Sequence, residues 1–274
     1  MTVEWSETPE TPLIAGGKKL EYFCVGPAPD EAPTIVMLHE GLGCAALWRD
    51  FPRRVSEATG MGVMVYSRQG YGQSEPAELP KPIDFMTREA VDVLPEILDQ
   101  IGFQRGILFG HSDGATIAAI YAGSVEDFRV RGLVLMAPHF FTEPSGLAAI
   151  ADAKTAFDSG DLRARMAKYH KNPDVAFRGW NDTWLNPEFK DWNVGEVIDY
   201  LRIPVLAIQG RDDQYGTLAQ IEEIESRAYS PVETLIPDGC KHAPHQEQPD
   251  AVLAAVAEFT ARLERIEAAE VETA

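Results

Sequence analysis

The sequence predicts an α/β fold built around a mostly parallel sheet. Short apolar and β-branched runs recur along the chain, and stretches with helical periodicity separate them. Apolar runs of about five residues are typical of strands that helices cover on both faces. The strands are expected at residues 34–38, 62–66, 106–109, 133–136, 204–208 and 232–236.

Helices are expected between and after these strands, at residues 84–101, 115–123 and 251–266. The alternation breaks between residues 139 and 199, where helical pieces and large aromatic residues occur without a strand-like run. Because the sheet pattern resumes afterwards, this excursion is an insertion rather than a second domain. We therefore expect a core of residues 1–138 and 200–274 and a helical cap of residues 139–199.

The charge balance excludes two classes of partner. The 274 residues include 24 basic and 43 acidic side chains, which give a formal net charge of −19. A surface of this sign repels nucleic-acid phosphates and anionic lipid, so neither nucleic acid nor a membrane is an expected partner. No apolar run approaches the roughly 20 residues that span a bilayer.

The cysteines and the N-terminal residues predict a cytoplasmic location. Cys24, Cys44 and Cys240 are odd in number and include no CxxC pair, which argues against a disulfide framework. The first seven residues are acidic and lack the basic and apolar regions of a secretory signal. The expected partner is a small-molecule substrate, and a homodimer stays open.

The strongest local signal is Gly110-His111-Ser112-Asp113-Gly114, a G-x-S-x-G motif between the third strand and a helix. In this context the motif forms a sharp turn that presents the serine hydroxyl at the carboxyl edge of the sheet. Glycines are needed because a Cβ at either position would collide with the neighbouring strand or helix. Ser112 is therefore the candidate nucleophile, and an ordinary glycine-rich turn is the alternative.

A second glycine-rich turn, His39-Glu40-Gly41-Leu42-Gly43, follows the first strand. From this edge of the sheet its backbone N–H groups can point at Ser112. The expected oxyanion donors are the N–H of Gly41, or of Leu42 one position on, and the N–H of Asp113. The alternative is a plain turn after a strand.

A serine nucleophile needs a base, and the base must be held by an acid. Of the six histidines, His242 and His245 lie in the loop after the last strand, where a side chain can reach back over the sheet edge. His242 is the expected base, and His245 is expected to be structural. The acid should follow the preceding strand, where Asp213 is favoured over Asp212. An aspartate at this place gives the chain order Ser, Asp, His that accompanies the motif.

These segments resemble the α/β-hydrolase superfamily over essentially the whole chain. The residues that carry the resemblance are 39–43, 67–74, 110–114, 210–213 and 242–247. The resemblance implies an α/β-hydrolase fold with a mostly parallel eight-stranded sheet, flanking helices and a helical cap. It also implies that His242, the first histidine of the last run, is the base. Ser112 separates the chain from relatives that need an aspartate nucleophile, such as haloalkane dehalogenases and epoxide hydrolases.

The chain departs from the family in the turn after the first strand. The family usually has His-Gly before the oxyanion residue, whereas this chain has His39-Glu40. The departure places a carboxylate near the site and leaves the donor register open between Gly41 and Leu42.

The resemblance implies acyl transfer. His242 takes the proton from Ser112 as the hydroxyl attacks a carbonyl, while Asp213 orients the imidazole. The oxyanion donors bind the developing charge, and water then hydrolyses the acyl-enzyme. No metal or organic cofactor is required. The expected activity is hydrolysis of a small to medium carboxylic ester or a related acyl bond.

Other functions are compatible with the same residues. C–C bond hydrolases of vinylogous diketones and the lyase of the menaquinone pathway share this triad, and the shape of the cap decides among them. A non-catalytic receptor or scaffold on the same fold is an alternative from another class. Such proteins often lose a member of the triad, and this chain retains all of them.

The aromatic residues of the insertion are candidates for an apolar substrate wall, although the core of the cap is the alternative for most of them. The candidate substrate contacts are Glu40, Leu42, Phe140, Phe141, Trp180 and Trp184. Asp113 and Glu40 flank the nucleophile and can receive an ammonium group. The Trp-Ser-Asp-Gly turn of valacyclovir-hydrolase-like enzymes is similar to residues 111–114, which favours esters that bear an amine. The alternative is that Asp113 caps the helix.

Overall fold

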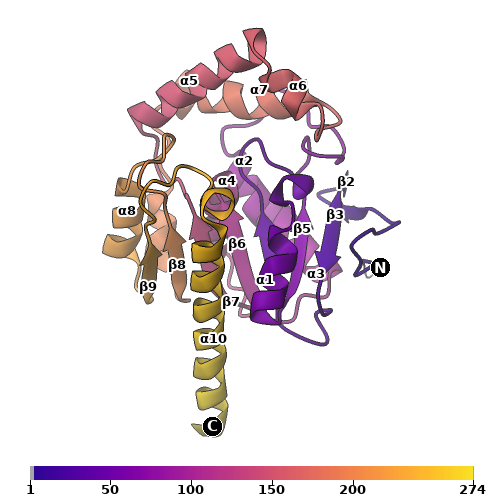
Figure 1. Ribbon diagram of the computed structural model, residues 1–274, viewed down its shortest axis with the longest axis vertical. Coiled ribbons are helices and arrows are strands. Elements are labelled where there is room, and N and C mark those ends of the chain that lie inside the picture. The colour runs from indigo at the N-terminus through magenta and orange to yellow at the C-terminus, as the bar shows by residue number, and fades with distance from the viewer. Residues whose placement is uncertain (1–2, 274) are drawn as a thin grey trace.

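Within residues 3–273, which the computed structural model describes, the main sheet has seven strands in the order β3-β5-β4-β6-β7-β8-β9 (Figure 1). β3 runs antiparallel to β5, and all other neighbouring strands are parallel. The strands are β3 (Tyr22–Val25), β4 (Thr34–Leu38), β5 (Gly62–Tyr66), β6 (Gly106–His111), β7 (Val130–Met136), β8 (Val205–Ile208) and β9 (Val232–Leu235). The predicted α/β class with a mostly parallel sheet is confirmed.

The sheet has one strand fewer than the eight that we expected. The chain before β3 forms a separate antiparallel hairpin of β1 (Leu13–Ala15) and β2 (Lys18–Leu20). Gly16 and Gly17 make its two-residue turn with φ of 57° and 68°, values that glycine adopts without strain. The hairpin pairs within itself and does not extend the sheet. Instead, Cys24 of β3 donates its amide to Ser6 O at 2.8 Å.

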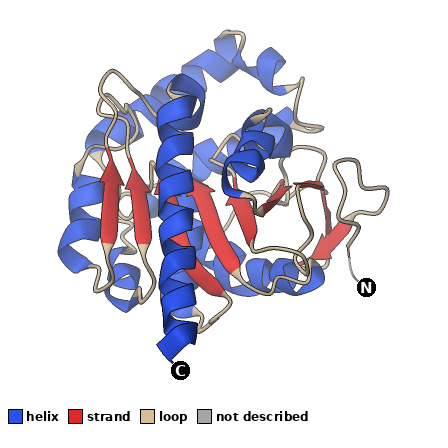
Figure 2. Cartoon of the chain, turned by 60° about the horizontal axis from the view of Figure 1, so that its bottom comes forward, coloured by secondary structure: helices blue, strands red, loops and turns tan. Residues whose placement is uncertain are grey.

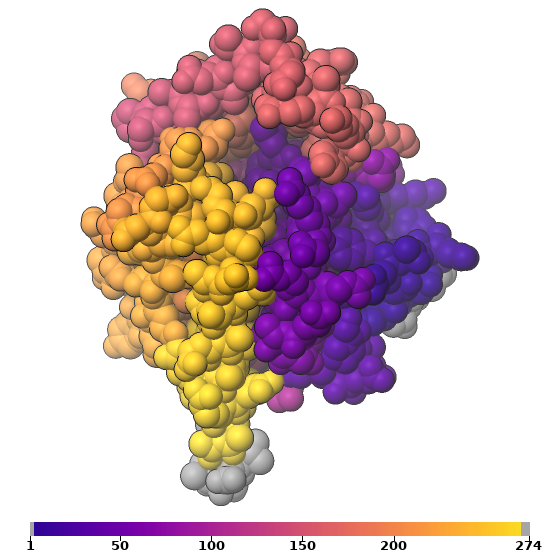
Figure 3. Space-filling model, in the orientation of Figure 1, coloured from indigo at the N-terminus to yellow at the C-terminus, as the bar shows by residue number. Residues whose placement is uncertain are grey.

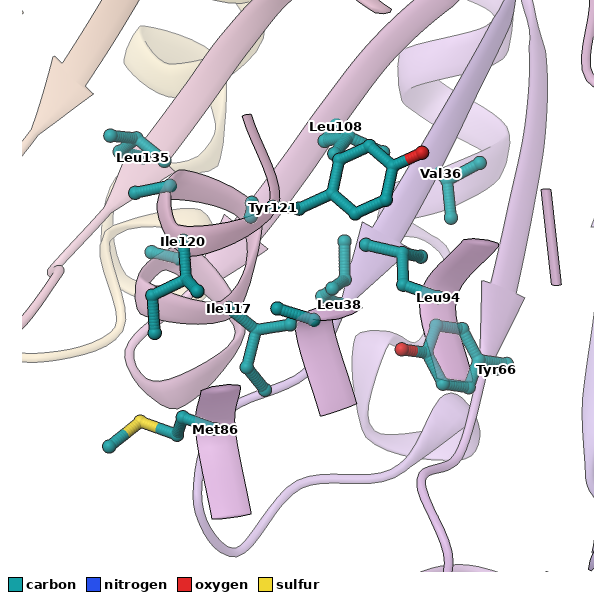
Figure 4. Close-up of a cluster of buried hydrophobic side chains, with 14 of the residues drawn as sticks. Val36, Leu38, Tyr66, Met86, Leu94, Leu108, Ile117, Ile120, Tyr121 and Leu135 are labelled. Atoms are coloured by element: carbon teal, nitrogen blue, oxygen red, sulfur yellow. The ribbon is translucent and has the colours of Figure 1, made fainter. Parts of the chain in front are cut away.

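Helices cover both faces of the sheet because alternate strand residues point to opposite sides (Figure 2). Ile35 and Met37 face α1 (Phe51–Thr59) and α10 (Pro249–Thr273). Val36 and Leu38 face the opposite layer, which includes α4 (Asp113–Ser124) and α8 (Ala219–Arg227). Figure 4 shows part of this second layer, where Ile117, Ile120 and Tyr121 of α4 belong to the same buried cluster as Leu108 and Leu135.

The expected helix at 84–101 is a run of three successive segments. They are α2 (Phe85–Arg88), the π-helical η2 (Glu89–Val93) and α3 (Leu94–Gln100). Pro95 explains the irregularity, because proline has no N–H to donate to the preceding turn. Helices α4 and α10 include the other two predicted helical ranges.

The insertion between β7 and β8 is helical, and it lies above one end of the sheet (Figures 1 and 3). Its elements are α5 (Pro144–Ser159), α6 (Leu162–Met166), α7 (Pro173–Trp184), η3 (Pro187–Phe189) and η4 (Gly195–Tyr200). Phe157 of α5 stacks on Phe177 of α7 with ring centroids 3.9 Å apart. Asn181 donates to Ile150 O at 2.8 Å, so the two helices are also joined by a buried hydrogen bond.

Two short helices flank the loops that matter for the site, η1 (Ala45–Trp48) after β4 and α9 (Pro244–Glu247) before α10. None of the helices in the described part of the chain is long and apolar enough to cross a membrane.

Truncation of Phe259 in α10 is expected to destabilise the fold. Its side chain is 1% exposed, and a Cβ added to Gly132 of β7 would lie 3.2 Å from its ring. Phe259→Ala should lower the free energy of unfolding by about 3–5 kcal/mol, measured by urea denaturation. The control Ile266→Ala removes a side chain of the same helix that is 45% exposed. Equal losses in the two variants would contradict this packing.

Candidate active site

Ser112 lies in a strained turn between β6 and α4. Its φ is 54° and its ψ is −120°, a backbone conformation that a side-chain-bearing residue rarely adopts. The turn needs both flanking glycines. A Cβ on Gly110 would lie 2.3 Å from Ala115 Cα, and a Cβ on Gly114 would lie 2.1 Å from Leu38 O. The Ser112 amide donates to Met136 O at 2.8 Å, so β7 also holds the turn.

His242 and Asp213 form a buried pair beside this turn. His242 Nδ1 donates to Asp213 Oδ2 at 2.8 Å, which leaves Nε2 as the free acceptor of the ring. Gln209 Nε2 donates to the same oxygen at 2.7 Å, and the Tyr215 amide donates to Asp213 Oδ1 at 2.8 Å. The structure therefore brings together the predicted base and the favoured aspartate, whereas Asp212 is exposed.

The environment of Asp213 favours its ionised form. Its side chain is fully buried, and burial alone would raise the pKa of the carboxyl. The positive charge that His242 carries when it is protonated and the hydrogen bond that it donates, together with the Tyr215 amide, outweigh burial and hold the pKa of Asp213 below its usual value.

The turn after β4 has its carbonyl groups held from outside. Glu40 O accepts from Arg68 Nη2 at 3.0 Å and from His39 Nδ1 at 2.7 Å, and Arg68 Nη1 donates to His39 O. Leu42 O accepts from His170 Nε2 at 3.1 Å. The amides of Gly41 and Leu42 donate no hydrogen bond to an acceptor among the described residues. This arrangement leaves both candidate oxyanion donors available.

Two histidines of this region are neutral and fixed by backbone contacts. His39 Nε2 accepts from the Arg68 amide at 3.0 Å, and His170 Nδ1 accepts from the Gly72 amide at 3.0 Å. Burial lowers the pKa of both rings, most strongly for His39, where the Arg68 charge adds to the effect. Sequence reasoning missed Arg68 and His170 as part of the site. Arg68 lies in the segment of residues 67–74 that resembles the family, and this resemblance was the signal that could have identified it.

The Asp113 carboxylate is directed at Arg68. It is almost fully buried, and Arg68 Nη2 lies 3.9 Å from Asp113 Oδ2. Neither carboxylate oxygen accepts a hydrogen bond from a described residue. Burial raises the pKa of the Asp113 carboxyl, and the Arg68 charge opposes this rise only in part. Asp113 also lines the cavity that contains Ser112 and His242, so the expectation that it receives a substrate ammonium group stays a prediction.

A cavity of about 180 Å³ joins Ser112 and His242 to the insertion. Of the predicted substrate contacts, Glu40, Leu42, Phe141, Trp180 and Trp184 line it. Phe140 does not line it. This side chain is fully buried in the core, and the Phe140 amide donates to Gln220 Oε1 at 2.7 Å. The lining residues that sequence reasoning missed are His139, Glu143, Gly146, Leu147, Ile150 and Tyr215.

Gly41 is packed directly under the insertion. A Cβ at this position would lie 2.2 Å from Trp180 Nε1, so the indole ring needs a glycine there. The Tyr215 ring contacts both the Trp180 ring and the His242 ring, with centroid distances of 6.3 and 4.8 Å. His139 is also close to His242, and burial lowers the pKa of His139 to about 3, so its ring is neutral.

His245 packs under the candidate base loop. Its ring centroid lies 4.9 Å from that of Trp48 and 5.5 Å from that of Phe51. Burial lowers the pKa of His245 to about 3, so it is a neutral core side chain. Within residues 3–273 no group of three or more His, Cys, Asp or Glu side chains is arranged to hold a metal ion.

Comparison with known proteins places these features in a family context. A model described as "Alpha/beta hydrolase family" matches residues 35–255. A proline iminopeptidase of Lactobacillus delbrueckii subsp. lactis is 29% identical over 77% of this chain and 69% of its own length. Epoxide hydrolase A of Mycobacterium tuberculosis is 25% identical over 85% of this chain and 92% of its own length.

A similar fold occurs among solved structures. The crystal structure of a proline iminopeptidase from Mycobacterium smegmatis superimposes with a TM-score of 0.73 at 19% identity, over 93% of this chain and 99% of that one. At this identity the likeness concerns the fold alone.

Replacement of Asp213 by asparagine is expected to make the free energy of unfolding less dependent on pH at acid pH. Because the folded protein holds the pKa of Asp213 low, the ionised carboxylate stabilises the fold above the unfolded value of about 4. That contribution is lost as the pH falls through the lower pKa of the folded state. The free energy of unfolding, measured by urea titration between pH 6 and 2, should therefore fall more steeply in the wild type than in Asp213→Asn.

The neighbouring Asp212→Asn is the matched control, since its side chain is exposed. It should keep the wild-type slope. Parallel profiles for the wild type and Asp213→Asn would contradict the role assigned to the His242–Asp213 pair.

Proposed function

The chain belongs to the α/β-hydrolase family, and on this premise we propose that it hydrolyses small to medium carboxylic esters through an acyl-enzyme on Ser112. The observation that carries the proposal is the hydrogen bond of 2.8 Å between His242 and Asp213, because it orients the His242 ring and leaves Nε2 free to act as a base. Ser112 and His242 line the same cavity, so a substrate there contacts both.

In the proposed reaction, His242 Nε2 takes the Ser112 proton while Oγ attacks the ester carbonyl carbon. The tetrahedral intermediate collapses as the C–O bond to the alcohol breaks, and His242 protonates the leaving alkoxide. Water then attacks the acyl-enzyme with His242 as base, and the carboxylic acid leaves Ser112 with its proton restored. Asp213 stays ionised and stabilises the imidazolium that forms in each step.

The amides of Gly41 and Asp113 are the proposed donors to the oxyanion. Gly41 N–H has no protein acceptor, and Asp113 is the first residue of α4, where a helix leaves its N–H groups free. Both amides also lie in backbone that other segments hold in place, so little reorganisation is needed when charge develops.

The cavity supports a substrate with an apolar acyl or alcohol group. Leu147 and Ile150 of α5 and Trp180 and Trp184 of α7 form much of its wall. Its volume of about 180 Å³ accommodates small to medium groups. No metal or organic cofactor takes part in the proposed steps.

A second candidate function is hydrolysis of esters or amides whose acyl part bears an amine. The observation that favours it is that three carboxylates, Glu40, Asp113 and Glu143, line the cavity. Of these, Glu143 also accepts hydrogen bonds from Thr217 and Gln220. The likeness to a proline iminopeptidase is in keeping with this candidate. The Asp113 carboxylate lies 3.9 Å from Arg68 and accepts no hydrogen bond from a described residue.

Labelling with a fluorophosphonate tests the nucleophile. Ser112 Oγ should displace fluoride from phosphorus, and Ser112→Ala should neither label nor turn over p-nitrophenyl esters, with a loss in kcat on the order of 10⁶-fold. Ser226→Ala, which removes an exposed hydroxyl on α8, is the control and should label like the wild type. Absence of labelling in the wild type would overturn the proposal. Turnover of a vinylogous diketone but of no ester would favour C–C bond hydrolysis instead.

A pair of matched substrates tests the second candidate. An aminoacyl ester and its deaminated analogue differ only in the ammonium group. A hydrogen bond to a charged partner is worth about 1.5–3 kcal/mol, so kcat/KM should be about 10- to 150-fold higher for the aminoacyl ester. Equal values of kcat/KM would rule this candidate out.

A further inference from the structure

Glu40 stands where the family usually has glycine, and a single protein group holds its carboxylate. Glu40 Oε2 lies 3.4 Å from His111 Nδ1. Among the described residues, no donor makes a hydrogen bond to either Glu40 oxygen. The side chain is 23% exposed and lines the cavity. Within the described part of the chain, His111 is the one cationic or titratable group that lies within ion-pair distance of this carboxylate.

His111 connects this carboxylate to the loop of the candidate base. The ring is buried, and its Nε2 lies 2.7 Å from the backbone oxygen of His242. A carbonyl oxygen only accepts hydrogen bonds, so Nε2 carries a proton. Nδ1 faces a carboxylate, which favours a proton on that nitrogen too. These partners assign His111 as an imidazolium ion paired with Glu40.

The other charged and titratable groups near His111 agree with this assignment. The ring faces the rings of His242 and His245 at centroid distances of 5.1 and 5.0 Å, and Asp213 adds a negative charge. His245 is neutral because burial lowers its pKa to about 3. Burial by itself would lower the pKa of His111, but Glu40 outweighs burial and raises this pKa above the usual value.

These contacts form a line from Glu40 through His111 to His242. Its first two members each precede, in the sequence, a residue that touches the reacting atoms. Glu40 precedes the oxyanion donor Gly41, and His111 precedes the nucleophile Ser112. The line ends on the base residue, His242, itself. We propose that the Glu40–His111 ion pair is a positioning element that sets the oxyanion turn, the nucleophile and the base relative to one another. The inference rests on the proposed function of Ser112.

The physical reason for an effect on rate is the precision that acyl transfer demands. A misplacement of about 1 Å between reacting groups lowers rates by about 100-fold. Glu40 and His111 do not contact the reacting atoms in this role, so substrate binding is maintained when they change. Loss of the pair should therefore lower kcat and leave KM for a neutral ester nearly unchanged.

Two substitutions of His111 separate its two contacts. Glutamine places its amide nitrogen near the position of Nε2 and keeps the donor to the His242 carbonyl, whereas asparagine places its amide near Nδ1 and loses that donor. His111→Asn should lower kcat by about 10- to 100-fold at constant KM, and His111→Gln should lower it less.

Substitution of Glu40 tests the other end of the line. Glu40→Gln should lower kcat for a neutral ester by about tenfold. The double variant Glu40→Gln/His111→Asn should be no slower than His111→Asn alone, because both changes break one line of contacts. Asp250→Asn is the acid-to-amide control, since this carboxylate pairs with Arg54 at the surface and should keep the wild-type kcat.

NMR titration of the histidine side chains gives a readout that does not depend on activity. In the wild type, both ring nitrogens of His111 should carry a proton at pH 7. The pKa of His111 should therefore lie above the usual histidine value of about 6.5. In Glu40→Gln, His111 should be neutral at pH 7. A neutral His111 in the wild type would overturn the proposal, and this titration decides even where a variant fails to fold.

The kinetic outcomes are equally decisive. Unchanged kcat in both His111→Asn and Glu40→Gln, in an enzyme whose Ser112 labels with fluorophosphonate, would overturn the positioning role while the proposed function stands. A rise in KM for aminoacyl esters alone in Glu40→Gln would assign Glu40 to substrate binding instead. Failure of the wild type to label would overturn the proposed function, and the NMR titration would still report on the ion pair.

Discussion

The backbone of Ser112 is held at a positive φ, and the arrangement of the site depends on that turn. A conformation of this kind costs about 1–3 kcal/mol, so the surrounding packing must impose it. It is imposed from both sides of β6, where Gly114 lies against the Leu38 carbonyl of β4 and the Ser112 amide donates to Met136 of β7. Contacts with the neighbouring strands β4 and β7 thus stabilise the strained backbone of the candidate nucleophile.

In the turn after β4, side chains of other segments donate hydrogen bonds to the carbonyl groups, while the amides of Gly41 and Leu42 donate to no acceptor among the described residues. In each peptide group, the C=O of one residue and the N–H of the next residue point in opposite directions. A hydrogen bond to the carbonyl therefore also fixes the direction of the next residue's N–H. Arg68, from the loop after β5, holds the carbonyls of His39 and Glu40, and His170, from the insertion, holds that of Leu42. Segments that are far apart in the sequence therefore set the direction of one short turn.

The carboxylates around Ser112 are divided among different partners. A buried carboxylate is costly unless a cation or donors accompany it. Asp213 is held by His242, Asp113 lies against Arg68, and Glu40 faces His111. Of these, Glu40 and Asp113 line the cavity, and Glu40 keeps part of its side chain exposed. The charge that a substrate meets is consequently decided by these pairings and not by the number of acidic residues near the serine.

The sequence by itself determined the α/β class, most strand positions and the candidates Ser112, His242 and Asp213, because apolar runs and turn glycines report local geometry and each candidate lies in the turn or loop after a strand. The short β1, β2 and β3 carry too little pattern to be found this way. Only the tertiary structure decided that Phe140 is buried while Phe141 lines the cavity, that Asp113 lies against Arg68, and that His111 links Glu40 to His242. These outcomes depend on contacts between distant segments, which local periodicity does not encode.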